Sequence, residues 1–340
     1  MLSPADYADK RRNIISENLI NLRETNFKHM KTIIWISIII IILAVIYFLG
    51  PKPAKPNLNA KISEEITPDL EKLEQEIIQS EKATPNLKED NNARIIWANP
   101  EKKEKTEFVV VYMHGFSASF KEGFPVNDDF AKRYGCNMYG ARLFGHGLSD
   151  KEALVDLTPE NYLETAKHAV AIGRQLGEKV ILMSTSTGGT LSLAIAAENP
   201  WIHSLILYSP NIDVADKSAN IFSKPWGMQI ARLIQGKYNE YDDPPEVQKY
   251  CQSKYRLEAV QAMKGLVDAT MTEETFIKVS QPLFLGYYYK NEEEKDPTVS
   301  IDRMLEMFEQ VSTPENKKWK VAFPNAGVHP IPSGILSKDV

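Results

Sequence analysis

The 340 residues are enough for one large domain or two modest ones. They carry 40 Lys and Arg against 45 Asp and Glu, so the net charge of −5 lacks the basic excess that nucleic-acid binding requires. Apolar residues make up 43% and charged residues 25%, as in a globular chain with a substantial core. Cys136 and Cys251 lie far apart without metal-ligand spacing, so we expect neither a zinc site nor a disulfide framework.

The first predicted element is a membrane span over residues 32–49. This run has no charged residue and is dominated by isoleucine, with Trp35 and Tyr47 near its ends. It is long enough to cross a bilayer, and no A-x-A cleavage site follows it. We therefore expect an N-terminal tail over 1–31, a retained single-pass anchor and the lipid bilayer as a partner. Basic residues at 10–12 favour a cytoplasmic N-terminus, which places the catalytic part on the extracytoplasmic side.

Residues 50–90 are predicted to be a linker. Its first part, PKPAKP over 51–56, cannot continue a helix and indicates an extended spacer. Thr67 and Pro68 then predict the start of a short amphipathic helix whose apolar positions are Leu70, Leu73 and Ile77. We expect this helix to lie on the domain that follows.

Residues 91–340 alternate strand-like and helical segments. The strand-like runs occupy 93–98, 107–113, 137–143, 179–184, 204–209, 282–289 and 318–323, and helices are predicted over 158–177, 187–197 and from Ser300 through Phe308. Because the strands lack period-two alternation, we expect helices on both of their faces and a mainly parallel, doubly wound α/β sheet. Ligands of such sheets bind beyond the carboxyl ends of the strands.

Two small-residue turns follow the second and third strands. In the first, His114 to Ser117, the N–H of Phe116 is predicted to lie beside that of Thr187, giving two donors for an oxyanion. His114 is expected to be a structural hydrogen-bonding residue rather than a base. The second turn, Gly145-His146-Gly147, is expected to pack near the pocket.

Ser186 is the predicted nucleophile. It stands at the apex of a strand, tight turn and helix, with small residues two positions before it (Ser184) and two after it (Gly188). The helix that begins at Thr187 directs free N–H groups and its positive end toward this serine. An ordinary Ser/Thr-rich helix N-cap is the alternative interpretation.

A serine hydroxyl needs a base and an oriented acid, because it is a weak nucleophile at neutral pH. Of six histidines, His329 lies on a glycine-containing loop beyond the last strand and is the predicted base. Asp296, on the loop after the penultimate strand, is the predicted acid. Asp213, after the preceding strand, is a competing position.

Together these motifs resemble the α/β-hydrolase superfamily, specifically its serine esterase and monoacylglycerol-lipase-like branch, over about residues 90–340. The segments that carry the resemblance are HGFSAS (114–119), FGHGLSD (144–150), STSTGG (184–189), KDPTV (295–299) and NAGVHPI (325–331). The resemblance implies a Ser186, Asp296 and His329 triad, an oxyanion hole from the N–H groups of Phe116 and Thr187, no cofactor and no metal.

The resemblance also implies a helical lid over about 214–278. Its apolar residues either line an acyl pocket or pack the lid onto the sheet; they are Ile221, Phe222, Trp226, Met228, Ile230 and Leu233.

The chain departs from the family pattern at two places. Ser184 replaces the usual first glycine of the elbow, and only eleven residues follow His329 where the family closes with a helix. Ser337 to Asp339 resembles the start of such a helix, but too few residues follow to complete it. We therefore expect the final helix to be lacking and one apolar face of the sheet to stay uncovered.

The resulting hypothesis is a membrane-tethered serine hydrolase that cleaves carboxylic esters through an acyl-enzyme, with acylglycerols as a candidate substrate class. The alternatives are an amide or peptide hydrolase of the same fold and a catalytically inactive binding module.

Overall fold

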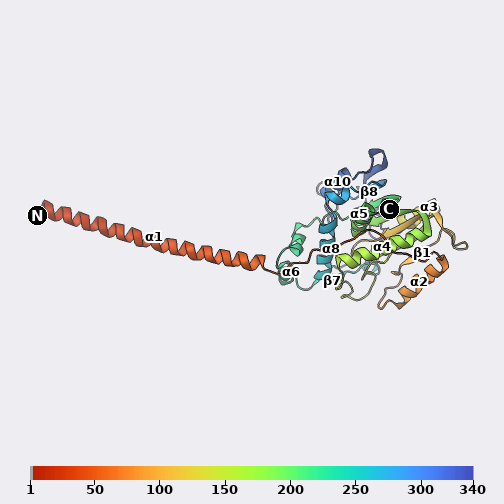
Figure 1. The fold of residues 1–340 in the computed structure, drawn as a ribbon, viewed down its shortest axis with the longest axis horizontal. Coiled ribbons are helices and arrows are strands. Elements are labelled where there is room, and N and C mark those ends of the chain that lie inside the picture. Colours follow the sequence, from red (N-terminus) through yellow and green to blue (C-terminus); the bar gives the residue numbers. More distant parts are fainter. Residues whose placement is uncertain (1–2, 340) are drawn as a thin grey trace. The chain divides into compact units, whose positions relative to one another are not determined.

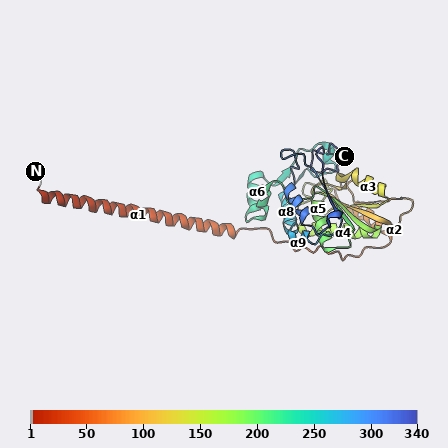
Figure 2. The same cartoon turned by 90° about the horizontal axis from the view of Figure 1, so that it is seen from above.

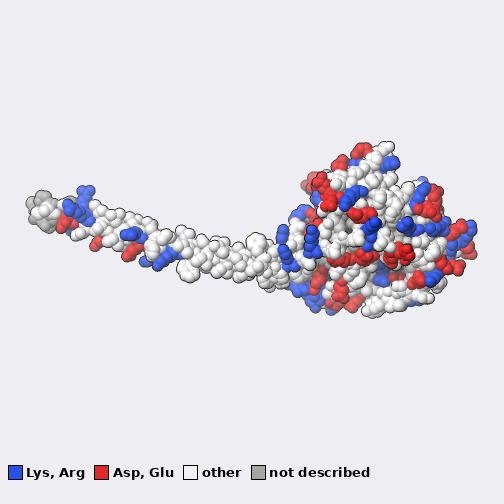
Figure 3. Space-filling view, viewed as in Figure 1, with Lys and Arg blue, Asp and Glu red and all other residues white. Residues whose placement is uncertain are grey.

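The computed structural model describes residues 3–339 and divides into two compact units, one up to Lys52 and one from Pro53 onward. The first unit is a single helix, α1 (Pro4–Phe48), drawn in red in Figure 1. The predicted tail and span thus form one continuous helix, since residues 5–49 contain neither glycine nor proline. By length and composition α1 is a candidate membrane span, and much of its surface is uncharged (Figure 3).

The linker is fastened to the second unit from Asn57 onward. The N–H of Asn57 donates to Glu160 Oε1 at 2.9 Å, and the side chain of Asn199 bonds to the backbone of Ala60 and Ile62. The helix predicted after it, α2 (Leu70–Ala83), buries Leu73 and Ile77 as expected. Its N-cap is Asp69 rather than Thr67, because an aspartate accepts the free N–H of Lys72 and also favours the positive end of the helix.

All seven predicted strands form one sheet in the order β1-β3-β2-β4-β5-β8-β9. The strands are β1 (Arg94–Ile96), β2 (Thr106–Met113), β3 (Asn137–Gly140), β4 (Gly177–Thr185), β5 (Ser204–Tyr208), β8 (Leu283–Tyr287) and β9 (Lys318–Ala322). Only β1 is antiparallel to its neighbour. The mainly parallel, doubly wound sheet is confirmed.

Helices cover both faces of this sheet, as Figure 2 shows for α3 (Val126–Tyr134) and α4 (Pro159–Leu176) on opposite sides. A large apolar core joins the sheet to α4, α5 (Thr187–Glu198), α8 (Leu257–Thr270) and α10 (Ile301–Gln310). A smaller core under α3 contains Tyr112, Phe120 and Met138, with the short 3-10 turn η1 (Phe120–Gly123) beside it. The predicted caps Thr158 and Ser300 begin α4 and α10.

The predicted lid is an insertion between β5 and β8. It consists of η2 (Lys217–Ser223), α6 (Gly227–Gln235), the hairpin of β6 (Tyr238–Glu240) and β7 (Lys254–Arg256), α7 (Pro245–Gln248), α8 and α9 (Glu273–Phe276). Phe222 and Leu257 form a small core with Ile221 and Met228, so these residues pack the lid rather than line an acyl pocket. Leu233 does neither, because 87% of it is exposed.

The chain after His329 runs beside Phe124 and Pro125, at the start of α3, and Ser337 to Asp339 form no helix. The N–H of Gly334 donates to Phe124 O at 2.7 Å, and Ile331 is buried with Tyr288 and Ala326. On β9, which follows the short turn η3 (Glu315–Lys317), Trp319 and Val321 remain 56% and 42% exposed. This edge of the sheet is therefore only partly covered.

Candidate active site

Ser186 sits in a strained turn between β4 and α5. Its φ of 54° and ψ of −122° lie where a non-glycine residue is rarely found. Backbone bonds on both sides hold it there: its N–H donates to Tyr208 O at 3.0 Å, and its carbonyl accepts from the N–H groups of Gly189 and Asn211. The turn that the sequence predicted thus holds this serine at a fixed position beyond the carboxyl end of β4.

The turn needs glycines because three backbones meet at it. A Cβ on Gly188 would lie 2.1 Å from Met113 O, and a Cβ on Gly115 would lie 3.0 Å from Ser186 Cβ. At Ser184, where the family pattern has glycine, the hydroxyl instead accepts a 2.9 Å hydrogen bond from Ser192 on α5. The extra hydroxyl therefore has a buried partner, and the elbow keeps its shape.

The two predicted oxyanion donors are the backbone N–H groups of Phe116 and Thr187. Phe116 follows β2 and Thr187 begins α5, and within residues 3–339 no carbonyl or side chain accepts from either N–H. The Phe116 ring packs edge-on against His146 and against Tyr255 of β7, at centroid separations of 5.9 and 5.0 Å. The Gly145-His146-Gly147 loop thus lies against Phe116, which carries one of the two predicted oxyanion donors.

Asp296 and His329 form a hydrogen-bonded pair. His329 Nδ1 lies 2.7 Å from Asp296 Oδ2, while Asp296 Oδ1 accepts from the N–H groups of Thr298 and Val299. Burial raises the pKa of Asp296, but His329 and these N–H groups outweigh it and hold that pKa below its usual range. Burial lowers the pKa of His329, yet the carboxylates of Asp296 and Glu122 raise it above its usual value. The imidazole is therefore oriented by a charged carboxylate.

His329 Nε2 is buried and has no hydrogen-bond partner among the described residues, Ser186 included. A general base requires one nitrogen that is fixed and one that can accept a proton. The structure brings Asp296 and His329 into contact and leaves the hydroxyl of Ser186 without a bond to them. Because catalytic hydrogen bonds are often long before substrate binds, the missing bond between Ser186 and His329 is compatible with their predicted roles.

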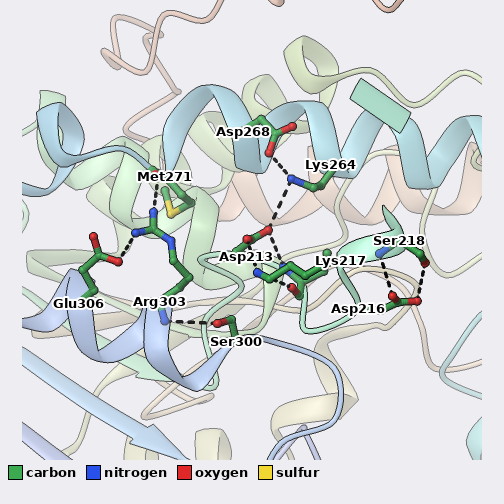
Figure 4. Close-up of polar contacts among 11 residues, drawn as sticks. Asp213, Asp216, Lys217, Ser218, Lys264, Asp268, Met271, Ser300, Arg303 and Glu306 are labelled. Atoms are coloured by element: carbon green, nitrogen blue, oxygen red, sulfur yellow. Dashed lines mark hydrogen bonds and ion pairs between the residues drawn. The ribbon is translucent and has the colours of Figure 1, made fainter. Parts of the chain in front are cut away.

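Asp213, the competing acid, belongs to a different group of charges (Figure 4). Its carboxylate pairs with Lys217 at 2.8 Å and with Lys264 at 3.5 Å, and Lys264 also pairs with Asp268 on α8. These ion pairs join the loop after β5 to the lid. Asp213 contacts no histidine in the part of the chain that the structure describes.

His114 and His146 are structural, as predicted for His114. His114 Nδ1 lies 2.8 Å from Gly115 O and its Nε2 accepts from the N–H of Leu143, and burial lowers its pKa to about 4. Burial also lowers the pKa of His146, whose ring stacks on Tyr162 at 5.3 Å. Both imidazoles are therefore neutral near pH 7.

Glu122 is a site residue that sequence reasoning missed. It comes from η1, and its Oε2 accepts from the N–H of Gly115 at 2.7 Å. Burial raises its pKa to about 7, while Gly115 and His329 act in the opposite direction. Its carboxylate thus fixes the turn that precedes Phe116 and acts electrostatically on His329. No local signal in the sequence points to it, because Glu122 stands between a buried Phe120 and an exposed Phe124 in no recognisable motif.

Comparison with protein families identifies the class to which this chain belongs. The family model described as "Serine aminopeptidase, S33" (Hydrolase_4) matches residues 104–280, more than half of the chain, so the chain belongs to this family of α/β-hydrolases. A comparison with curated protein sequences found no match.

Solved structures with the same fold include lipolytic enzymes. One is described as belonging to "LipS and LipT, two metagenome-derived lipolytic enzymes"; it is 14% identical, with a TM-score of 0.58 over 72% of this chain and 91% of that chain. Another is a Paleococcus ferrophilus monoacylglycerol lipase, 14% identical, with a TM-score of 0.52 over 70% of this chain and 89% of that chain. The α/β-hydrolase resemblance is thereby confirmed at the level of the fold.

Proposed function

We propose that this protein is a serine hydrolase that cleaves carboxylic esters through an acyl-enzyme and is tethered to a membrane by α1. The observation that carries the proposal is the Asp296 and His329 pair, with Nδ1 held at 2.7 Å and Nε2 without a partner in the described residues. The strained elbow at Ser186 supplies the nucleophile. A base oriented in this way serves the activation of a hydroxyl.

In the proposed reaction, Ser186 Oγ attacks the ester carbon while His329 Nε2 takes the hydroxyl proton. The N–H groups of Phe116 and Thr187 donate to the resulting oxyanion. The tetrahedral species collapses, the C–O bond to the alcohol breaks, and His329 returns the proton to the leaving oxygen. Water then attacks the acyl-enzyme with the same histidine as base, which releases the acid and restores Ser186.

The substrate class that we propose is an acylglycerol-type ester. Two enzymes that share the fold are described as lipolytic or as a monoacylglycerol lipase. A chain with a candidate membrane span would also be held where lipid esters are found. A membrane tether is therefore consistent with a lipid ester as the substrate.

The second candidate is the cleavage of an aminoacyl amide. The family description names a serine aminopeptidase, and an aminopeptidase must bind a substrate ammonium. Glu122, whose carboxylate approaches Gly115 beside Ser186, is the kind of group that would bind it.

A substrate panel separates the two candidates. The purified full-length protein is given p-nitrophenyl esters of increasing acyl length, a monoacylglycerol and aminoacyl p-nitroanilides, with folded Ser186→Ala as the matched control. We expect the esters to be hydrolysed with the highest kcat/KM, and Ser186→Ala to lose on the order of a thousandfold or more. Faster cleavage of the anilides would favour the aminopeptidase, and no turnover by the folded protein would favour an inactive binding module.

A further inference from the structure

The segment over residues 84–93 connects α2 to β1 (Figure 1) and precedes the part of the chain that the family model matches. It is fixed to the loop after β3, because the N–H of Lys88 donates to Gly147 O at 2.9 Å. His146 of that loop packs against the ring of Phe116. A segment outside the matched family region thus lies close to the predicted oxyanion donors.

Two side chains of this segment bind the lid hairpin of β6 and β7. Lys88 Nζ donates to Gln248 O and to Cys251 O, both at 2.8 Å. Asn91 Nδ2 donates to Lys249 O at 2.9 Å. These carbonyls lie at the end of α7 and just after it, where backbone oxygens lack partners within the helix. Burial lowers the pKa of Lys88, as expected for an ammonium group removed from much of its water.

The turn after α7 in turn binds the loop that follows β2. The N–H of Gln252 donates to Ser117 O at 2.6 Å. Ser117 is the third residue of a tight turn that closes when the N–H of Ala118 donates to Gly115 O at 3.3 Å, and its φ is 65°. Glycine adopts such a φ readily, but it is costly for serine and persists only where the surroundings hold it. The bond from Gln252 provides that support.

This tight turn also carries the predicted donor Phe116. Because Phe116 and Ser117 are the two central residues of one turn, a change in the backbone of Ser117 redirects the N–H of Phe116. The ring of Phe116 packs against Tyr255 of β7 at 5.0 Å, so the lid hairpin contacts the turn at two points. Lys88 and Asn91 therefore act on the oxyanion turn through the hairpin that they bind.

We propose that Lys88 is a positioning residue for the oxyanion hole. It fixes the turn after α7, the N–H of Gln252 in that turn holds the carbonyl of Ser117, and the N–H of Phe116 is thereby kept in the direction that an oxyanion needs. The inference rests on the serine mechanism of the proposed function. Removing an oxyanion donor outright costs about 10²-fold to 10³-fold in kcat, so a donor that is only loosened should cost about tenfold.

A pair of substrates separates an effect on the oxyanion hole from a general disturbance of the site. The full-length protein is given a p-nitrophenyl ester and the corresponding thionoester, in which sulfur replaces the carbonyl oxygen. Sulfur is a weak hydrogen-bond acceptor, so the thionoester gains little from the oxyanion donors. The ratio of kcat/KM for the two substrates therefore reports on these donors, whereas a displaced Ser186 or His329 slows both reactions.

Lys88→Met keeps an unbranched side chain and removes both hydrogen bonds to the hairpin. We expect kcat/KM to fall about tenfold for the ester and less than about twofold for the thionoester, with the acid limb of the pH profile unchanged. Asn91→Ala removes the third bond and should lower the ratio by a smaller factor. Lys254→Met is the matched control, since Lys254 lies on β7 and pairs with Glu240 at 2.6 Å, and it should leave the ratio unchanged.

The outcomes separate the positioning role from the serine mechanism. Circular dichroism and titration of active sites with a fluorophosphonate restrict the rates to folded protein. A native ratio in folded Lys88→Met, or equal losses on both substrates, would overturn the positioning role and leave the serine mechanism standing. If Lys88→Met does not fold, an unchanged ratio in Asn91→Ala overturns the role. If the native protein does not hydrolyse the ester, the proposed function fails, and the positioning role fails with it.

Discussion

Asp296 and Asp213 follow neighbouring strands, β8 and β5, yet they have different partners. Asp296 binds His329, whereas Asp213 binds two lysines. Asp296→Asn should therefore lower kcat steeply, by about 10³-fold to 10⁴-fold, because the imidazolium loses its counter-charge. Asp213→Asn should change kcat less than tenfold. Steady-state kinetics of both variants, with circular dichroism to check folding, would contradict the assignment if the ranking were reversed.

Glu122 gives a prediction on pH dependence. The base His329 must be neutral to accept a proton, so kcat/KM should rise with pH as it deprotonates, and the charge of Glu122 raises the pKa at which this happens. Glu122→Gln keeps an acceptor for the N–H of Gly115 and removes the charge. The acid limb of the kcat/KM profile should move to lower pH in this variant. An unchanged limb would show that Glu122 does not act on His329.

The same substitution has a stability signature. The folded pKa of Glu122 is about 7, above its ordinary 4.5, so the folded state binds more protons between these values and stability falls as pH rises through them. At pH 8 the ionised group costs on the order of 3 kcal/mol. Denaturant unfolding should find Glu122→Gln more stable than the native chain at pH 8, with the advantage vanishing below about pH 4.5.

The proposed triad was predictable from sequence, because Ser186, Asp296 and His329 each stand in a local motif beyond a strand-like run. Glu122 was not, because its role depends on η1 turning its carboxylate back toward Gly115 seven residues earlier. Nothing in the local spacing around Glu122 signals this contact.

At the scale of elements, the close approach of α5 to β2 depends on Gly188. A Cβ at this position would lie 2.1 Å from Met113 O. Because Met113 O is a backbone atom, rotation of a side chain cannot relieve this clash. Gly188→Ala should displace the elbow, lower the melting temperature and lower kcat/KM at least a hundredfold.

Gly265 on α8 provides the matched control for this change. A Cβ there meets only Pro159 at 3.5 Å, so Gly265→Ala should be neutral or stabilise the protein by up to about 1 kcal/mol. Thermal unfolding and steady-state kinetics of the two alanine variants compare their stability and activity. Equal effects of the two substitutions would contradict the close approach.

The strands of the main sheet were predictable because β-branched runs separated by helices leave few other arrangements. The lid was not predictable in detail. Its strands, Tyr238–Glu240 and Lys254–Arg256, are three residues long and lack a β-branched signal, so the sequence alone does not predict that they pair. The cap of α2 shows the same limit, since Thr67 and Asp69 are both acceptable N-caps and the local fold selects Asp69.

At the scale of the whole molecule, the two units have different surfaces. Among residues 3–339, the four apolar cores lie in the second unit, and the side chains of the candidate span in α1 are not buried. The full-length protein should therefore stay in the membrane fraction after high-salt and alkaline carbonate washes, which remove proteins held only by charge. A shortened protein that begins at Pro53 should be found in the soluble fraction and should keep its activity.

Topology is a separate question that the same protein can answer. Protease added to intact cells should reach the second unit if the catalytic part is extracytoplasmic, as the basic residues before the span favour. Recovery of the full-length chain in the soluble fraction at its uncleaved mass would contradict the tether.

The central claim is that Ser186 is the nucleophile, and covalent labelling tests it most directly. The full-length protein is treated with a fluorophosphonate and analysed by intact mass and by peptide mapping. The account predicts about one adduct per chain, located on Ser186, no adduct in folded Ser186→Ala, and slower labelling of Asp296→Asn. An adduct on another residue, or equal labelling of the native and Ser186→Ala proteins, would contradict the serine mechanism.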